Sequence, residues 1–574
     1  MVDWKGLIMI HLFGKSIPRP QTNSTVVNLL VSVLIVCCAN VSLWRELAGR
    51  FGVETVGHWV FMVTVGLSLF LLFNILLSFF SFRPVYKPFL IIILVLAATI
   101  SYYMDSYGIV IDKQMITNLL ETDMRESSEQ LTWPLFKRIA LLGFLPSLLL
   151  LVTKINYRPW RRELLVRGSI ILCSSAILVV LILANFKQIT LFGRENKVLR
   201  MYINPTYPIY SLIKTVKKNH QSSSKEPLRI IAADAKRPVD TPRTAVVLVV
   251  GETARAEQFS LNGYKRNTNP QLGTKEIINF SDVQSCGTDT AESLPCMFFH
   301  LGKGKYSRNE AKRYENLLDV LKRTGVEVIW RDNNSGSKGV GDRVAFQDLT
   351  RAQDEALCSS GECYDEILLQ DLGQLLEKNK SNMFIVLHQK GSHGPSYYKR
   401  SPKDFEKFLP ECTQDNVQDC DRQSIINAYD NTIVYTDYVL AKLIDLLQSQ
   451  KYSTAMLYVS DHGESLGENN VYLHGLPFAI APQQQTHVPM IFWASQKFLH
   501  EKNIDPAQLA RHQNDRFTHD NLFHSMLGLF DVKTELYRGD LDLFRSTQSR
   551  QPDRARLAGC EDETTNNAGK RQHL

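Results

Sequence analysis

The chain has 574 residues, a formal net charge of +7 at pH 7 and a hydrophobic fraction of 44%. This length exceeds that of one ordinary domain, so we expect two. Long apolar stretches fill the first third, and the remainder has the mixed composition of a soluble protein. No aromatic and basic nucleic-acid-binding module is recognisable in the sequence, so nucleic acid is excluded as an expected partner.

Five stretches in the first third approach the roughly 20 apolar residues that a helix needs to cross a bilayer. They are Val26–Val41, Val60–Phe80, Pro88–Tyr103, Phe136–Val152 and Ser169–Ala184. Any one of them also fits a core helix of a large soluble protein, but five in succession favour a membrane domain. We therefore predict five transmembrane helices within residues 1–189. No small-residue cleavage site follows the first, so we expect it to remain as an anchor.

Basic residues between the spans predict which side is cytoplasmic. They are Lys5, Lys15 and Arg19 before the first span, Arg83 and Lys87 after the second, and Lys154, Arg158, Arg161, Arg162 and Arg167 after the fourth. Acidic residues offset the basic ones on the other side. With five spans, the N-terminus stays in the cytoplasm and the chain after about residue 190 is exported.

Residues 190–240 connect the apolar third to the rest of the chain. They interleave aromatic, proline and basic residues: Tyr202, Pro205, Tyr207, Pro208, Tyr210, Lys214, Lys217 and Lys218. Such a mixture suits an amphipathic segment at the membrane surface. An ordinary linker is the alternative.

Six cysteines of the exported part form three close pairs. They are Cys286/Cys296, Cys358/Cys363 and Cys412/Cys420. None has CxxC spacing, so the pattern favours local disulfides in an oxidising compartment over a structural zinc site. Nearest-neighbour pairing is the simplest connectivity, although the sequence does not prove it. Cys37, Cys38 and Cys173 fall in predicted spans, and Cys560 lies in a polar tail.

Residues 241–545 alternate strand-like and helical segments. The strand-like runs are Thr244–Val250, Val326–Trp330, Met383–Leu387, Ala455–Val459 and Val488–Trp493, and the helical stretches include Glu315–Arg323, Tyr364–Lys378 and Ile425–Leu447. This alternation predicts a mostly parallel sheet covered by helices on both faces. Such sheets place functional groups at the carboxyl ends of their strands. Residues 546–574 are polar, and we expect them to be disordered.

Acidic and histidine side chains follow two of these strands. Asp461 and His462 come after one strand, and Glu252 comes after another. Two carboxylates and one imidazole suit zinc, and the hydroxyl of Thr290 would complete a tetrahedral set. Zinc would also activate that hydroxyl as a nucleophile toward a phosphate group. Thr288 is a competing candidate for the nucleophile.

Three further side chains lie in glycine-containing loops and can contact phosphate. They are Lys338, His393 and His474. A histidine can donate to phosphate oxygens or protonate a leaving alkoxide. A lysine can bind phosphate as a point charge. A structural role for each histidine and a solvated surface position for the lysine are the alternatives.

Four motifs of the exported part are specific in combination. They are Gly251-Glu252-Thr253-Ala254-Arg255, Asn262-Gly263-Tyr264, Cys286-Gly287-Thr288-Asp289-Thr290 with Pro295-Cys296-Met297-Phe298, and Ser460-Asp461-His462-Gly463-Glu464-Ser465. Together they resemble the lipid A phosphoethanolamine transferases, the family that includes the mobile colistin-resistance enzymes. The resemblance extends from the five spans to about residue 545. It implies an α-helical five-span membrane domain and an α/β alkaline-phosphatase/sulfatase-like domain on the periplasmic face of the inner membrane.

The same resemblance implies roles for particular residues. Zinc would be held by Glu252, Thr290, Asp461 and His462, with Thr290 rather than Thr288 as the nucleophile. Asn118, Thr122 and Glu126 stand at i, i+4 and i+8 and share one face of a helix. In the family, residues matching these three bind the phosphoethanolamine head group, together with those matching Lys338, His393 and His474. From the residues alone, that helix face is an ordinary polar surface.

The expected activity is a ping-pong transfer. Thr290 would attack the phosphorus of phosphatidylethanolamine, and a phosphate of lipid A would then take the phosphoethanolamine group. The added amine would weaken binding of polymyxin and other cationic peptides. We expect a monomer whose partners are the donor lipid, lipid A and the inner membrane. The alternatives are another envelope acceptor such as a lipopolysaccharide core sugar, a hydrolase or sulfatase, and a non-enzymatic membrane scaffold, which the complete ligand set disfavours.

Overall fold

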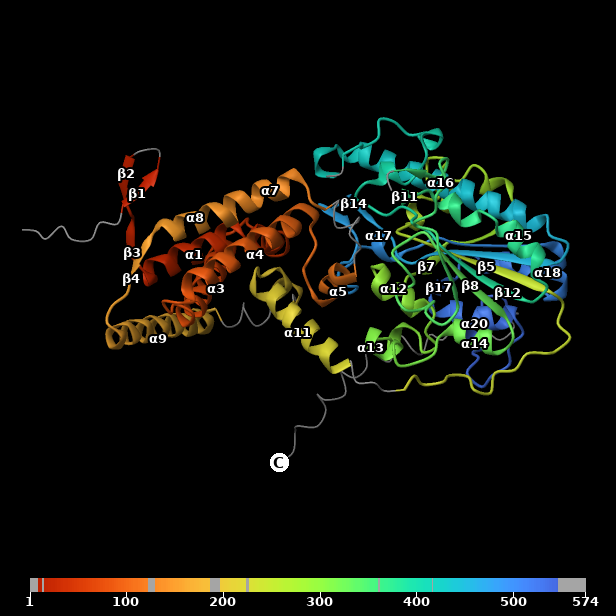
Figure 1. Ribbon diagram of the computed structural model, residues 1–574, viewed down its shortest axis with the longest axis horizontal. Helices are drawn as coiled ribbons and strands as arrows, with labels where there is room; N and C mark the ends of the chain where they lie inside the picture. Colours follow the sequence, from red (N-terminus) through yellow and green to blue (C-terminus); the bar gives the residue numbers. More distant parts are fainter. Residues whose placement is uncertain are drawn as a thin grey trace, which may run out of the picture.

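The computed structural model describes residues 9–12, 15–121, 130–185, 197–222, 227–359, 362–414 and 417–545. It shows a bundle of long helices beside a larger α/β domain (Figure 1). The tail expected to be disordered, residues 546–574, lies outside the described residues. So do Cys560, Thr122 and Glu126.

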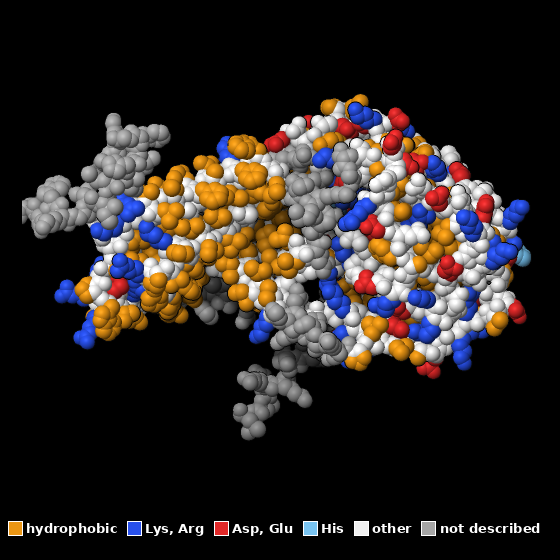
Figure 2. Space-filling model, viewed as in Figure 1, with side chains coloured by type: hydrophobic (Ala, Val, Ile, Leu, Met, Phe, Trp, Pro, Cys, Tyr) orange, Lys and Arg blue, Asp and Glu red, His pale blue; other side chains and the backbone are white. Residues whose placement is uncertain are grey.

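The first third of the chain supplies the long helices. Among the described residues, four helices are long and apolar enough to cross a membrane: α3 (Val56–Phe79), α4 (Tyr86–Tyr107), the helical stretch Trp133–Val152 and α9 (Trp160–Ala184). A fifth span results if the bent pair α1 (Ser24–Cys38) and α2 (Val41–Phe51) counts as one. Hydrophobic side chains cover the visible surface of this bundle (Figure 2). Such a surface suits lipid rather than water.

The first predicted span is not one straight helix. α1 and α2 meet at an angle of 53° on either side of Ala39 and Asn40. The Asn40 amide donates to the carbonyl oxygens of Ile35 (2.9 Å) and Asn204 (2.8 Å). The first bond gives a donor to a carbonyl of the last turn of α1, and the second ties the break to Asn204. The expected span Val26–Val41 therefore covers α1 and ends where α2 begins.

The fourth predicted span is irregular at its centre. α7 (Trp133–Ile139) passes through a π-helical turn, Ala140–Phe144, into α8 (Leu145–Val152). Gly143 packs against Val95 of α4, where an added Cβ would lie 3.2 Å from the Val95 Cα. The glycine therefore allows the two helices to approach closely.

A seven-stranded sheet forms the centre of the α/β domain. Its order is β6 (Ile278–Phe280), β16 (Met490–Ala494), β13 (Ser453–Ser460), β5 (Thr244–Gly251), β12 (Met383–His388), β8 (Glu327–Asp332) and β9 (Ala345–Asp348). β13, β5, β12, β8 and β9 are parallel, and β16 is antiparallel to β13. The expected strand-like runs all contribute to this mostly parallel sheet.

Helices cover both faces of the sheet, as expected. Val246, Leu248 and Val250 of β5 face a core with α12 (Thr290–Met297), α14 (Leu317–Arg323) and α20 (Asp520–Leu529). The alternate β5 residues face α15 (Leu372–Lys378) and α16 (Arg422–Gln448). A buried strand presents successive side chains to opposite faces, so one strand serves both cores.

One predicted helix is divided. The segment Tyr364–Lys378 forms a 3-10 helix, Asp365–Leu369, and then α15. Asp371 lies between them with φ of 55°, a left-handed conformation that stops a helix. Apolar spacing continues across the break, so the pattern did not reveal it.

The remaining elements are short or connecting. They include β1 (Met9–Leu12), β2 (Lys15–Pro18), β3 (Gln21–Asn23), α5 (Lys113–Glu121), β4 (Lys154–Asn156), α11 (Thr206–Ser222), β7 (Asp282–Gln284), α13 (Arg308–Ala311), β10 (Cys358–Ser359), β11 (Glu362–Cys363), β14 (Ser465–Glu468), β15 (Val471–Leu473), α17 (Gln483–Thr486), α18 (Gln496–Glu501), α19 (Pro506–Arg511) and β17 (Arg516–Thr518). α5 and α11 lie between the helical bundle and the α/β domain (Figure 1).

The six cysteines of the α/β domain are paired with their nearest neighbours. The disulfides are Cys286–Cys296, Cys358–Cys363 and Cys412–Cys420. The first joins the segment after β7 to α12 and therefore encloses Thr290. The expected connectivity is confirmed.

Candidate metal-dependent active site

Polar side chains gather where the parallel strands end. Glu252 follows β5, and Asp461 and His462 follow β13, its neighbour in the sheet. Thr290 is the first residue of α12. The carboxyl ends of adjacent parallel strands open on one edge of a sheet, which explains why residues far apart in sequence meet here.

Glu252, Asp461 and His462 form a compact, fully buried cluster. One ligand atom of each lies within 4.8 Å of the others. His462 Nε2 is 3.2 Å from Glu252 Oε1 and 3.5 Å from Asp461 Oδ2. His462 Nδ1 lies 2.9 Å from the carbonyl oxygen of Gly463, which orients the ring with Nε2 toward the two carboxylates.

Thr290 reaches this cluster and Thr288 does not. Thr290 Oγ1 lies 3.0 Å from Glu252 Oε2 and 3.4 Å from His462 Nε2. The Thr290 side chain is half-buried, so a substrate can approach it. Thr288 is fully buried, and its hydroxyl donates to the carbonyl oxygen of Leu476 at 2.7 Å.

The three buried groups shift one another's proton affinities. Burial lowers the pKa of the His462 imidazole, but Asp461 and Glu252 outweigh burial and raise it to about 10. Burial and the negative charge of Glu252 raise the pKa of Asp461 to about 6. Burial also opposes ionisation of Glu252, yet the hydrogen bond and charge of His462 hold its pKa well below the usual range. The cluster thus concentrates negative charge that a cation can balance.

The donor set fits a divalent cation. Asp461 Oδ1 accepts the backbone N–H of His462 at 2.7 Å, whereas Oδ2 is buried and accepts no hydrogen bond from the described residues. An orphaned carboxylate oxygen beside a second carboxylate and an imidazole is otherwise costly. Two carboxylates and one imidazole are ligand types of a catalytic metal site, and the adjacent hydroxyl can occupy its fourth position.

Neighbouring backbone and side chains hold Glu252 in place. Asn334, in the loop after β8, donates to Glu252 Oε2 at 2.7 Å. Gly391 has φ of 56°, and an added Cβ would lie 2.5 Å from the Glu252 carbonyl oxygen. Sequence reasoning did not single out Asn334. The signal for it was its position just after a predicted strand of the same sheet.

A second group of side chains fixes the helix that begins at Thr290. Asp289 caps α12 by accepting the backbone N–H of Glu292 at 3.0 Å. Gln114 of α5 donates to the other carboxylate oxygen of Asp289. α5 therefore contacts the helix that begins at Thr290. Sequence reasoning missed Gln114 because no local pattern marks this long-range contact.

The expected phosphate-binding residues lie at different distances from the cluster. The His474 ring centroid is 4.4 Å from that of His462 and 5.4 Å from that of His393. Asn118 of α5 lies beside Gly475, the residue after His474. Lys338 lies further along the loop that carries Asn334, and its ammonium group donates to Ser335 Oγ at 2.7 Å.

Comparisons with known proteins identify the family. Residues 244–532 match the family model described as Sulfatase, and residues 69–220 match Phosphoethanolamine transferase EptA/EptB. The chain is 36% identical to phosphoethanolamine transferase EptA of Escherichia coli (strain K12), across 93% of this chain and 99% of the relative. The chain belongs to the phosphoethanolamine transferases. The expected family is therefore confirmed.

Two further relatives of this phosphoethanolamine transferase extend the comparison. Phosphatidylethanolamine transferase Mcr-1 of Escherichia coli is 41% identical, across 88% of this chain and 94% of the relative. The solved integral membrane protein lipooligosaccharide phosphoethanolamine transferase A (EptA) from Neisseria meningitidis superposes with a TM-score of 0.88 at 35% identity. That match covers 92% of this chain and 99% of the Neisseria chain. A helical membrane part and a sulfatase-like domain are thus the family's architecture.

Proposed function

We propose that this phosphoethanolamine transferase uses zinc to move phosphoethanolamine from phosphatidylethanolamine to a phosphate of lipid A. The observation that carries the proposal is the position of Thr290 Oγ1, 3.0 Å from Glu252 Oε2 and 3.4 Å from His462 Nε2. The activities of two relatives support both substrates, since one is a phosphatidylethanolamine transferase and the other a lipooligosaccharide phosphoethanolamine transferase.

The domain boundaries and the location of each domain are part of this proposal. Residues 1–189 form the domain in the inner membrane, and residues 190–240 link it to the catalytic domain along the membrane surface. Residues 241–545 form the periplasmic catalytic domain, and residues 546–574 form a tail. The exposed apolar side chains of α11, such as Leu212 and Ile213, support a position at the lipid surface.

Glu252, Asp461 and His462, with Thr290 as the fourth ligand, are the residues that would hold the metal. When bound, zinc lowers the pKa of the threonine hydroxyl and neutralises charge on phosphate oxygens. Asn334 and the Gly463 carbonyl orient Glu252 and His462 for this role. Such supporting contacts fix the orientation of metal ligands.

The first half-reaction forms a covalent intermediate. The Thr290 hydroxyl gives its proton to Glu252 Oε2, which accepts its hydrogen bond, and its oxygen attacks the phosphorus of the donor lipid while the bond from phosphorus to the diacylglycerol oxygen breaks. The leaving oxygen takes a proton, for which His474 and His393 are the nearby donors. In the second half-reaction an acceptor phosphate oxygen attacks the same phosphorus. Thr290 Oγ leaves and regains its proton.

The membrane spans explain how both substrates reach the site. Donor and acceptor are lipids of one bilayer, and the helical bundle contacts the nucleophile's helix through Gln114. We propose a monomer, because one chain supplies every residue of this site. The added amine reduces the negative charge of lipid A and with it the binding of polymyxin.

Mass spectrometry of lipid A from cells that express the chain tests the proposal. Wild-type cells should yield lipid A with the mass increment of one phosphoethanolamine, and cells expressing the Thr290→Ala variant should not. An increment on the core sugars instead would reject lipid A phosphate as the acceptor. If no envelope lipid gains this mass and water cleaves the labelled donor instead, the chain is a hydrolase.

A further inference from the structure

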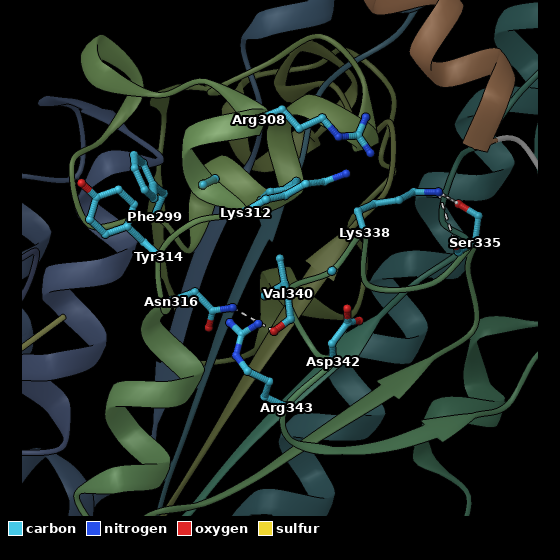
Figure 3. A pocket seen from close by; sticks show the side chains of 13 residues that line it. Phe299, Arg308, Lys312, Tyr314, Asn316, Ser335, Lys338, Val340, Asp342 and Arg343 are labelled. Carbon is cyan, nitrogen blue, oxygen red and sulfur yellow. Dashed lines mark hydrogen bonds between the residues drawn. The ribbon is translucent and has the colours of Figure 1, made fainter. Parts of the chain in front are cut away.

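A pocket separate from the metal-ligand cluster opens beside α12. It has a volume of about 660 Å³ and lies between the C-terminal end of α12, α13 and the loop of residues 335–343. Asn316, the residue that caps α14, donates to the carbonyl oxygen of Val340 at 2.9 Å and fixes that loop (Figure 3). The pocket is therefore built from several connected elements of the fold.

Positive charge dominates the pocket. Arg308, Lys312, Lys338 and Arg343 line it, and Asp342 is the one acid among the lining residues that the structure describes. Arg308 and Lys312 extend from α13 in the direction of Lys338 (Figure 3). Arg343 instead donates to Asp319 at 2.6 and 2.7 Å. The guanidinium of Arg308 and the ammonium of Lys312, side by side on one wall of the hollow (Figure 3), favour a phosphorylated ligand.

Aromatic rings form another wall. The rings of Phe299 and Tyr314 meet edge to face, with centroids 6.0 Å apart. Aromatic faces beside cationic groups provide apolar contact for the carbon skeleton of a ligand whose polar groups are bound elsewhere. A sugar phosphate has both features, an apolar ring face and a dianionic group.

The pocket is close enough to Thr290 to hold part of a reacting substrate. Pro295 lines it, and Pro295 is five residues after Thr290 on the same helix, about 7.5 Å along the axis. Lys338 lines it on the other side. A phosphorylated disaccharide can place one phosphate at Thr290 and a second phosphate in this pocket.

The charge of the pocket also discriminates between the two lipids. A phosphoethanolamine head group carries an ammonium group, which several nearby cations would repel. An acceptor with two phosphates has no such group. We infer that Arg308 and Lys312 bind the second, non-reacting phosphate and its sugar in the acceptor glycolipid. This inference deepens the proposed function, on which its choice of ligand rests.

Equilibrium binding tests the pocket without any catalysis. The full-length chain carrying Thr290→Ala is titrated with fluorescent lipid A that has two phosphates, and with its one-phosphate derivative. Adding Arg308→Ala or Lys312→Ala should weaken binding of the two-phosphate ligand about tenfold, as loss of one charged contact predicts. The one-phosphate derivative, with its phosphate at Thr290, should bind each variant equally. Lys380→Ala is the matched control, because Lys380 is exposed near the start of β12, at the opposite end of the sheet.

The outcomes separate this inference from the proposed function. Equal binding of the two-phosphate ligand by all variants would overturn the pocket assignment. Equal weakening for both ligands would also overturn it, because that result indicates contact with the anionic lipid surface in general. Release of diacylglycerol from labelled phosphatidylethanolamine, measured with wild-type protein, tests the proposed reaction. If that release is absent while the binding difference persists, the proposed reaction fails and the phosphate pocket stands.

Discussion

Thr290 and Thr288 are two residues apart, and their hydroxyl groups have different surroundings. Thr290→Ala should abolish transfer and change unfolding free energy by less than about 0.5 kcal/mol, since it removes one hydroxyl at the rim of an open site. Thr288→Ala removes the 2.7 Å bond to Leu476. It should cost about 0.5–1.5 kcal/mol of stability and keep transfer activity.

Lipid A mass spectra and thermal unfolding of both purified variants measure these effects. Activity that survives in Thr290→Ala but is lost in Thr288→Ala would assign the nucleophile to the other threonine.

The buried cluster makes a prediction about the metal. Glu252→Ala, Asp461→Ala and His462→Ala should each lower zinc content and transfer activity together, because each removes one ligand of a four-member set. Asn334→Ala leaves the three side chains in place but removes the bond to Glu252, together with the bond to the Gln389 carbonyl oxygen, and should lower metal affinity about 10–100-fold. Elemental analysis of the purified proteins measures the metal. Fully active protein that contains no zinc would contradict the mechanism.

That Glu252, Asp461 and His462 lie together could be predicted from the sequence because all three follow buried strands directly. The end of a continuous apolar run marks the end of a buried strand, and the sheet brings the ends of neighbouring strands together. Asn334 could not be predicted in this way. It follows β8, which reaches Glu252 only because β12 lies between β8 and β5. Strand order depends on the packing of the whole domain, and a local pattern does not contain it.

At the scale of elements, the Cys286–Cys296 disulfide holds the segment that carries Thr290, the proposed nucleophile. It closes a loop of sequence separation 10, and Cys412–Cys420 closes one of 8. Replacing either pair with serine should therefore cost a similar amount, about 2–3 kcal/mol by loop-closure entropy. The first replacement should also lower the transfer rate of protein that remains folded, because Thr290 lies within its loop.

Thermal unfolding and initial rates at matched amounts of folded protein separate the two effects. Peptide mapping without reductant should find all six cysteines oxidised. Free thiols at these positions would place the domain in the cytoplasm and overturn the topology.

The contact between α5 and α12 could not be predicted from the sequence. Family resemblance indicated a role for the face of α5 that carries Asn118, but no sequence pattern indicated the contact that Gln114 makes. Gln114→Ala removes the hydrogen bond to Asp289, the N-cap of α12. It should lower the rate of the threonine-modifying step while metal content stays unchanged. Single-turnover release of diacylglycerol measures this step, and an unchanged rate would show that the contact does not position Thr290.

At the scale of the whole molecule, the basic segments gather at one end of the helical bundle. β3 pairs with β4, which brings the chain before the first span beside Lys154. Lys87, at the start of α4, donates to the carbonyl oxygen of Thr153 at 2.7 Å. Three segments that were assigned to the cytoplasm from charge alone are therefore neighbours in space. A single membrane face explains all three.

This arrangement makes a prediction about topology that requires no enzymatic activity. Arg161→Cys places a thiol at the exposed start of α9, and Lys380→Cys places one on the exposed surface of the α/β domain. In intact cells with a permeabilised outer membrane, an impermeant maleimide should label Lys380→Cys above the level of the parent chain. Arg161→Cys should react only after the inner membrane is broken, because the charges around it are held on the cytoplasmic side. If Arg161→Cys is labelled before the inner membrane is broken, the chain has the opposite orientation and its catalytic domain does not lie in the periplasm.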